Sequence, residues 1–437
     1  MQLLRFKNPY LLFLPFLFLY FILVIIHPTK GNQGDEGRYL MFANNLLHGF
    51  YSPPPPEINI WNGPGYPLLL MPFVALHLPL MAITLLNSLL YYFSIILLYK
   101  SLQKFVSNNK TIFISLCWAC YYISFFEMSL ILSEVFTSFL ITLLILNILQ
   151  AYNLDKQSKK HAIYSGLIIA YIVLTKVIFS YVLIFMLVGS GLLYLLYKKA
   201  FNYKRSLLIL IIAFAGILPY IIYTYHLTNK IYYFGDSGGM SLYWMSSPFE
   251  NEVGDWQHER ELHANNSADS SIINSDTKTI PGWNNYLYIN HYKDYQLLDN
   301  YVGVQRDDMY KKLAFNNIKT HPGKFVKNCI SNAQRLFYSF PYSYTLQRNN
   351  FRLPLTQFLV VGIFICGLFS VINWRKLPFP LRFLLILLLS YLCLTILVST
   401  YTRMLTVVVP ILLFWFAYTF QKSIIISLKM NAGANKD

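Results

Sequence analysis

The sequence predicts an all-α integral membrane protein with about ten transmembrane helices, juxtamembrane helices on the outer face and one mainly helical extracytoplasmic lobe. Three observations predict this fold. Of the 437 residues, 56% are hydrophobic and 12% are charged, whereas soluble domains carry about 25% charged residues. Apolar runs long enough to cross a hydrocarbon core of roughly 30 Å recur along the chain. Short basic clusters separate these runs, as in the loops of polytopic proteins.

The predicted spans are the apolar runs near 10–27, 81–99, 111–126, 129–150, 161–175, 177–197, 206–226, 355–373, 379–398 and 404–421. The first run follows two basic residues, Arg5 and Lys7, as a signal peptide would. It ends without a small-residue cleavage site, so we interpret it as a retained first span.

The basic residues set the orientation of these spans. They form clusters that fall on one side of the membrane: Arg5/Lys7, Lys100/Lys104/Lys110, Lys156/Lys159/Lys160, Lys198/Lys199/Lys204/Arg205, Arg375/Lys376/Arg382 and Lys422/Lys429. That side is predicted to be the cytoplasm, with both termini on it. A net charge of +16 distributed in this way indicates membrane topology and no nucleic-acid partner.

This alternation requires that the proline-rich apolar stretch 64–79 does not cross the membrane, so we expect a short re-entrant or surface-lying helix there. An amphipathic helix is predicted before it, because Tyr39, Phe42, Ala43 and Leu46 repeat at helical spacing.

Three parts follow from this topology. Residues 1–226 form an N-terminal transmembrane module that includes a first external loop, 28–80. Residues 227–354 form an extracytoplasmic lobe, which is too long for a passive connection. Residues 355–437 form the C-terminal transmembrane helices and a short cytoplasmic tail. Within the lobe, helices are predicted at 304–318 and 322–340 from apolar residues at three- and four-residue spacing.

Asp35 and Glu36 are the first candidate site residues. These adjacent carboxylates lie just outside the first span, where a lipid headgroup would arrive. A carboxylate at this place can deprotonate an acceptor or bind a cation. The alternative is that both cap the following helix, since acids favour helix N-termini.

A second group of candidates is Glu134, Lys176 and Arg403. Glu134 lies near the outer end of the fourth span, where an ionisable group costs ~2.5 to 3.5 kcal/mol and needs a partner or a function. Lys176 and Arg403 are the matching cations, with snorkelling to the interface as the alternative. The topology places all of these residues and the lobe on one face, which favours an active site at the outer membrane surface over a transporter's midplane site.

Arg348 belongs to a basic segment where the lobe returns to the membrane. Arginines in such a place bind either a substrate phosphate or the anionic lipid of the bilayer. The sequence leaves both alternatives open.

Several motifs resemble one known family. The strings DEGRY at 35–39, ANNLLHG at 43–49 and NGPGYPLLL at 62–70 resemble the first external loop of GT-C glycosyltransferases, in the branch of protein O-mannosyltransferases and lipid A aminoarabinose transferases. Further matches are Ser133-Glu134, Leu174-Thr175-Lys176, His321-Pro322-Gly323-Lys324-Phe325 and Arg403 followed by Pro410, so the resemblance covers most of the chain. The string NGPG at 62–65 departs from the family pattern, as does Val177 after the lysine, which leaves the substrate subgroup open.

The resemblance implies transfer of a hexosyl or pentosyl group from a polyprenyl-phosphate donor to a glycan, lipid or protein acceptor. It implies that Asp35, with Glu36 beside it, is catalytic as a general base. Lys176, Arg403 and Arg348 would bind the donor phosphate, and Tyr39, Tyr66 and Glu134 are further site candidates. No cofactor is expected, and a divalent cation is not indicated. The expected location is the bacterial inner membrane, with the site facing the periplasm or exterior and in contact with membrane lipid. The rival functions are a transporter or flippase of lipid-linked sugars, and a polysaccharide polymerase or ligase.

Overall fold

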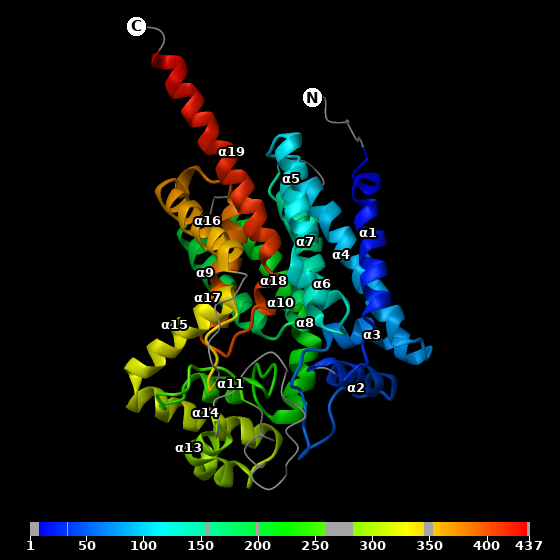
Figure 1. Ribbon diagram of the computed structural model, residues 1–437, viewed down its shortest axis with the longest axis vertical. Helices are drawn as coiled ribbons and strands as arrows, with labels where there is room; N and C mark the ends of the chain where they lie inside the picture. The colour runs from blue at the N-terminus through cyan, green and yellow to red at the C-terminus, as the bar shows by residue number, and fades with distance from the viewer. Residues whose placement is uncertain are drawn as a thin grey trace.

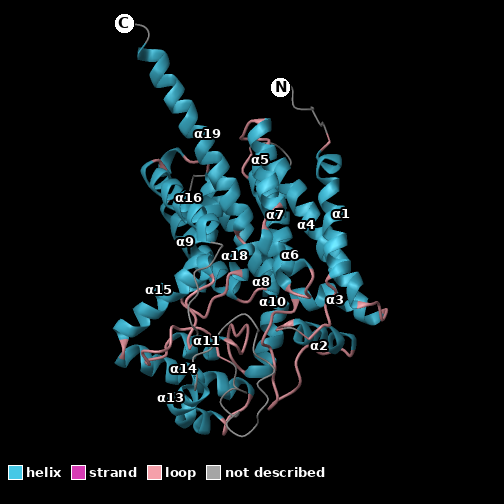
Figure 2. Cartoon of the chain, viewed as in Figure 1, coloured by secondary structure: helices cyan, strands magenta, loops and turns pink. Residues whose placement is uncertain are grey.

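The computed structural model describes residues 8–32, 34–153, 158–197, 201–257, 283–344 and 353–434. These residues form helices and loops, with no strand among them (Figure 2). The helices of the bundle are α1 (Pro9–Ile26), α4 (Leu80–Leu102), α5 (Asn108–Ala119), α6 (Tyr122–Met128), α7 (Ser133–Ala151), α8 (Ser158–Thr175), α9 (Ile178–Leu196), α10 (Phe201–Thr228), α16 (Leu353–Ile372), α17 (Phe379–Ile396), α18 (Arg403–Thr406) and α19 (Val409–Ala434).

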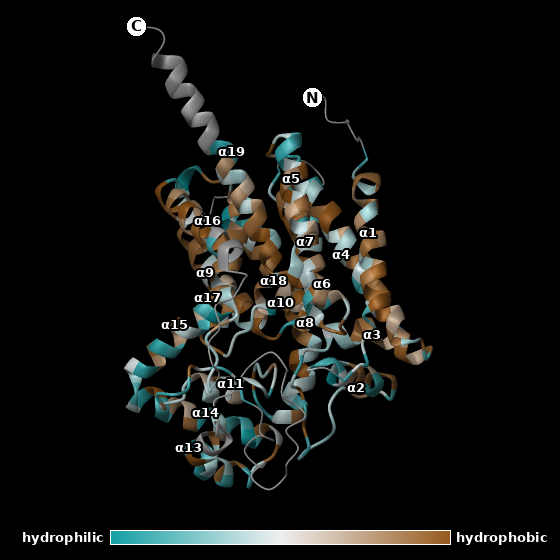
Figure 3. Cartoon of the chain, viewed as in Figure 1, coloured by the Kyte–Doolittle hydropathy of each residue, from teal (hydrophilic) through white to brown (hydrophobic). Residues whose placement is uncertain are grey.

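Each predicted span corresponds to a helix or a helix pair of this bundle. Within the described residues, six helices are long and apolar enough to cross a membrane: α1, α4, α7, α9, α10 and α17. A seventh span results if α5 and α6, which are bent by 48° at a short break, count as one. Brown, hydrophobic ribbon dominates the bundle in Figure 3. The all-helical integral membrane fold is therefore confirmed, while the exact number of ten spans stays a prediction.

The two ends of the bundle differ. Figure 1 shows the start of α1 and the end of α19 at one end, and α2, α3 and the lobe helices at the other. This arrangement agrees with the predicted topology, in which the termini and the lobe lie on opposite sides of the membrane.

The helix α7 lies inside the bundle. In its most apolar stretch of 18 residues, 78% is buried, compared with 17% in α1. Its hydroxyl groups bond to carbonyl groups one turn earlier, as from Thr137 to Ser133 (2.6 Å) and from Ser138 to Glu134 (2.9 Å). A helix surrounded by protein can carry such polar residues at membrane depth. The start of α7 is therefore a place where the fold tolerates Glu134.

The first external loop forms α2 (Glu36–Leu47) and α3 (Gly65–Ala75), as predicted. Glycines allow this loop to approach the end of α8 closely. A Cβ atom at Gly63 would clash with the Leu174 carbonyl oxygen at 2.1 Å, and one at Gly65 would clash with the Thr175 hydroxyl at 2.5 Å. Tyr171 of α8 also donates a hydrogen bond to the carbonyl of Gly65 (3.0 Å). The unusual NGPG string thus lets the loop approach the turn that carries Lys176.

The described part of the lobe contains α11 (Gly238–Met245), α13 (Trp283–Leu298), α14 (Gly303–Thr320) and α15 (Pro322–Tyr338). The last two confirm the helices predicted at 304–318 and 322–340. The lobe has its own core, whose buried members are Met240, Tyr243, Trp244, Leu287, Tyr295, Leu298, Tyr310, Ala314 and Tyr344.

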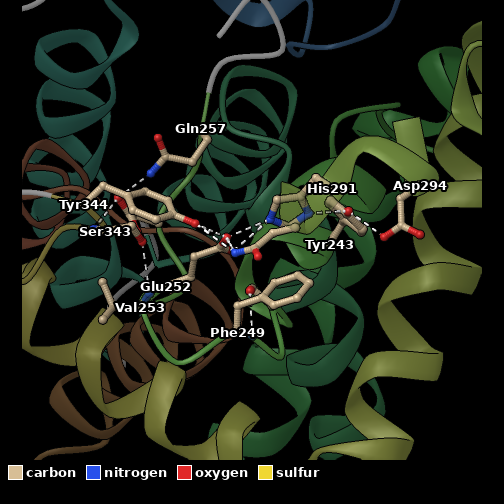
Figure 4. A network of polar contacts seen from close by, with 12 residues as sticks. Tyr243, Phe249, Glu252, Val253, Gln257, His291, Asp294, Ser343 and Tyr344 are labelled. Atoms are coloured by element: carbon tan, nitrogen blue, oxygen red, sulfur yellow. Dashed lines mark hydrogen bonds and ion pairs between the residues drawn. The ribbon is translucent and has the colours of Figure 1, made fainter. Parts of the chain in front are cut away.

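A buried polar network crosses this core (Figure 4). His291 of α13 lies 2.9 Å from a Glu252 oxygen, and Tyr243 of α11 lies 2.6 Å from the other nitrogen of His291 and donates to Asp294 (2.7 Å). Tyr344 also donates to Glu252. Burial would raise the pKa of Glu252, but its bonds to His291 and other donors outweigh burial and lower it. The network fixes three separate segments of the lobe to one another.

Candidate functional site

Four charged side chains from distant parts of the chain meet at the lobe-facing end of the bundle. Asp35 precedes α2, Glu134 lies in the first turn of α7, Lys176 lies between α8 and α9, and Arg403 begins α18. The Arg403 guanidinium donates to Asp35 Oδ2 (2.9 Å), and its Nε lies 3.7 Å from Glu134 Oε1. Lys176 Nζ lies 2.8 Å from the same Glu134 oxygen. We call these four residues the boundary cluster.

The boundary cluster has capacity for another ligand. Glu134 is only 2% exposed, and its Oε2 has no hydrogen-bond partner among the described residues. The Arg403 and Lys176 side chains are 31% and 16% exposed, and the contacts above do not use all of their N–H donors. Arg38 adds a third cation that bonds to Asp35. Guanidinium and ammonium groups with unused donors favour an anionic ligand.

Asp35 is held by arginines on both of its oxygens. Arg403 takes Oδ2, and Arg38 takes Oδ1. Burial would raise the pKa of this carboxyl, but Arg403 and Arg38 outweigh burial and lower it, so the carboxylate is ionised at neutral pH. Its side chain makes no capping bond to α2. Asp35 thus occupies the N-cap position of α2 while its side chain bonds to the two arginines.

Glu36 lies beside Asp35 but occupies a different environment. It is fully buried, and its Oε1 accepts hydrogen bonds from the Thr29 hydroxyl (2.6 Å) and the Ile131 backbone (2.8 Å). These bonds fasten the start of α2 to the segment that leads into α7. Glu36 thus positions the helix that presents Asp35.

Tyr39 and Tyr66 form a buried wall behind the cluster. Their rings meet edge to face with centroids 5.0 Å apart. The Tyr39 hydroxyl lies 3.0 Å from Ser133 Oγ, next to Glu134. Tyr66 is fully buried. Arg348 lies outside the described residues.

Two residues of this region were not predicted from the sequence. Arg38 lies one helical turn after Asp35, at a spacing that pairs opposite charges. Glu127 of α6 is 4% exposed and accepts a hydrogen bond from Thr406 of α18 (2.9 Å). The signal that identified Glu134, a carboxylate at the end of an apolar run, was also present at Glu127.

Metal coordination is not indicated by the described part of the chain. Within it, no three His, Cys, Asp or Glu side chains group closely enough to hold an ion. The absence of a cofactor stays a prediction.

Comparisons with known proteins give structural likeness only. No protein-family model matches the chain, and no curated protein matches it in sequence. It is similar to the crystal structure of ArnT from Cupriavidus metallidurans bound to undecaprenyl phosphate, at 12% identity and a TM-score of 0.38 over 94% of this chain and 77% of that one. For ArnT in the apo state the values are 12%, 0.39, 93% and 77%.

A third similar structure is the archaeal oligosaccharyltransferase AglB from Archaeoglobus fulgidus, in complex with an inhibitory peptide and a dolichol-phosphate. The identity is 13% and the TM-score 0.46, over 96% of this chain and 51% of that one. The chain therefore spans about half the length of AglB.

Proposed function

We propose that this protein is a GT-C glycosyltransferase that moves a sugar from a polyprenyl-phosphate donor to an acceptor on the extracytoplasmic face. The observation that carries the proposal is the boundary cluster, because its four residues come from four separate motifs of the family resemblance and yet are joined by ion pairs. A lipid-linked donor keeps its prenyl tail in the bilayer while its phosphosugar reaches the surface. A site between bundle and lobe suits such a substrate.

In this proposal Lys176 and Arg403 bind the donor phosphate. Charge-assisted bonds from guanidinium and ammonium groups are the strong ones for phosphate oxygens. When the donor phosphate binds to the Arg403 guanidinium, a phosphate oxygen replaces Asp35 Oδ2 as the acceptor of the Arg403 hydrogen bond. This exchange frees a carboxylate oxygen and weakens an interaction that lowers the pKa of Asp35. Donor binding would therefore make Asp35 a stronger base.

The chemical step is a direct displacement. The acceptor hydroxyl oxygen attacks the anomeric carbon, and the bond from that carbon to the phosphate oxygen breaks. The proton of the hydroxyl passes to Asp35. The polyprenyl phosphate leaves with its new negative charge beside Lys176 and Arg403, which stabilise that charge in the transition state.

The rival proposal is a transporter or flippase of lipid-linked sugars. The broken pair α5 and α6, with the buried Glu127, is a feature found in transporter sites. Against it, the boundary cluster lies where α7 and α18 begin, and not in the middle of a span. A polymerase or ligase would share the donor chemistry and differ in its acceptor.

The finer assignments belong to the same proposal. We place the protein in a bacterial inner membrane with the boundary cluster facing the periplasm, and we expect no cofactor. The transferred group is a hexose or a pentose, and the acceptor is a glycan, a lipid or a protein.

Release of polyprenyl phosphate in detergent micelles tests the proposal. Purified protein is supplied with polyprenyl phosphosugars and a panel of glycan, lipid and peptide acceptors, and the released lipid phosphate is measured by mass spectrometry. A transferase releases it in an acceptor-dependent manner. A transporter has no membrane to work across in micelles, so no release with any acceptor would favour the rival.

A further inference from the structure

A polar cavity lies beside Arg38, the residue that bonds to Asp35. Its volume is about 350 Å³, within the range of small-ligand sites. Among the residues that line it are Arg38, Glu57, Asn59, Trp61, Asp236 and Arg306. They come from the first external loop, from the segment before α11 and from α14, so the cavity forms only where the loop and the lobe meet.

The lining combines an aromatic ring with groups that accept and donate hydrogen bonds. The Arg38 guanidinium lies over the Trp61 ring, 4.7 Å from its centroid. Asp236 Oδ2 accepts a bond from the Ile60 backbone (3.0 Å), while its Oδ1 is buried and accepts no hydrogen bond from another described residue. Burial raises the pKa of Asp236 to about 6. A buried carboxylate oxygen without a partner costs free energy unless a ligand donates to it.

The charges of the lining exclude some ligand classes. Glu57, Asp236 and Asp307 face the cavity with Arg38 and Arg306, so the lining has no excess of positive charge for a phosphate. Asp307 is already bonded to Lys311 and to the Gly239 backbone. Ile58, Met240 and Tyr310 also line the cavity, but they share it with five charged side chains, which disfavours a lipid chain. Hydroxyl groups, which both donate and accept, suit this mixture of carboxylate, amide and guanidinium groups.

The position of Arg38 connects the cavity to Asp35. Arg38 lines the cavity and bonds to Asp35 Oδ1, while Arg403 bonds to Oδ2 from the bundle side. A donor phosphate at Arg403 and a molecule in the cavity would thus approach the same carboxylate from opposite sides.

We propose that this cavity is the acceptor subsite and that the acceptor is an uncharged saccharide, whose hydroxyl group reaches Asp35 past Arg38. The proposal rests on the proposed function and narrows its acceptor to one chemical class. Trp61 would pack against the sugar ring, and Asp236 Oδ1 would accept a bond from one of its hydroxyl groups.

A binding experiment that needs no donor tests the first half. Methyl glycosides of glucose, galactose, mannose and N-acetylglucosamine are titrated to millimolar concentration while the tryptophan emission is followed. We expect a saturable change of the tryptophan emission in the wild type. Trp61→Phe should abolish this change, whereas Trp374→Phe, on the opposite side of the bundle, should retain it. A change that persists in Trp61→Phe, or no change with any glycoside, would overturn the subsite.

A kinetic experiment tests the second half. Asp236→Asn keeps the size of the side chain, and we expect it to raise the KM for the saccharide acceptor about tenfold, the effect of one hydrogen bond to a charged group. The donor KM should not change. The control is Glu250→Gln, which removes an exposed carboxylate elsewhere in the lobe.

The outcomes separate the two proposals. Polyprenyl phosphate release with an unchanged acceptor KM in Asp236→Asn would reject the subsite and leave the transferase intact. Release that depends only on phosphate-bearing or lipid acceptors would likewise reject a saccharide subsite. Saccharide binding without any release would reject the transferase, while the emission change would still support the cavity as a sugar site.

Discussion

The molecule buries charged groups in two regions that are built differently. In the lobe, Glu252 accepts bonds from His291 and Tyr344 (Figure 4). It also accepts a bond from Asn290. In the boundary cluster, Glu134 keeps an oxygen without a partner among the described residues, and the Arg403 side chain is 31% exposed. The lobe network uses its bonding capacity to hold segments together, whereas the boundary cluster retains capacity for a ligand. In this comparison, unused hydrogen-bonding capacity distinguishes the charged groups of the proposed binding site from those that stabilise the lobe.

The largest expected effect comes from the boundary cluster. Asp35→Asn keeps the size of the side chain but cannot take the acceptor's proton, so turnover should fall by a factor on the order of 10² to 10⁴. The measurement is polyprenyl phosphate release in micelles. The matched variant is Glu36→Gln, which changes the neighbouring carboxylate; it should be milder because Glu36 only positions α2 in our assignment. Equal rates for the wild type and Asp35→Asn would remove Asp35 as the base.

The lobe network should respond in stability instead of chemistry. His291→Ala removes one of the hydrogen-bond partners of the buried Glu252, and leaving a buried polar group unsatisfied costs about 1 to 3 kcal/mol, more for a charged one. We expect a lower thermal unfolding temperature in detergent, with Glu250→Gln as the control. Turnover per folded molecule should stay near the wild-type value. A folded, stable His291→Ala protein that has lost turnover would contradict the comparison, since it would give the network a part in the reaction.

Arg403→Ala should weaken donor binding. A charged hydrogen bond to a phosphate contributes roughly 1.5 to 3 kcal/mol, so the KM for the polyprenyl phosphosugar should rise about ten- to a hundredfold. Lys319→Ala removes an exposed cation from the lobe and serves as the control. A well-folded Arg403→Ala protein with the wild-type KM would exclude Arg403 from the donor site.

The sequence was sufficient for the fold because hydropathy and basic clusters act locally. They located the bundle helices, the helices α14 and α15, and the face that carries Asp35, Glu134, Lys176 and Arg403. They could not define the pairing, since Arg403 and Asp35 are 368 positions apart and meet only through the packing of α2 against the bundle. For the same reason the sequence left open whether Glu36 caps or reacts: its backbone partner precedes α7, 95 residues away. Arg38 and Glu127 were missed although local signals existed for both.

The smallest effect concerns pH and sharpens the role of Arg403. In the free protein the pKa of Asp35 is lowered, because Arg403 and Arg38 outweigh the burial that would raise it. A carboxylate with a lowered pKa stays ionised until the pH falls below about 4, the usual pKa of an aspartate. The ratio kcat/KM reports the free enzyme, so it should decrease only below about pH 4.

In the complex, the donor phosphate replaces Asp35 as the partner of Arg403 and adds a negative charge nearby, and both changes raise the pKa of Asp35. The acid limb of kcat should therefore lie at higher pH than the acid limb of kcat/KM. The two pH profiles, measured at saturating and at low donor concentration, decide this. Coincident acid limbs would show that Arg403 does not exchange its bond to Asp35 for a bond to the phosphate, even if Arg403→Ala raises the donor KM.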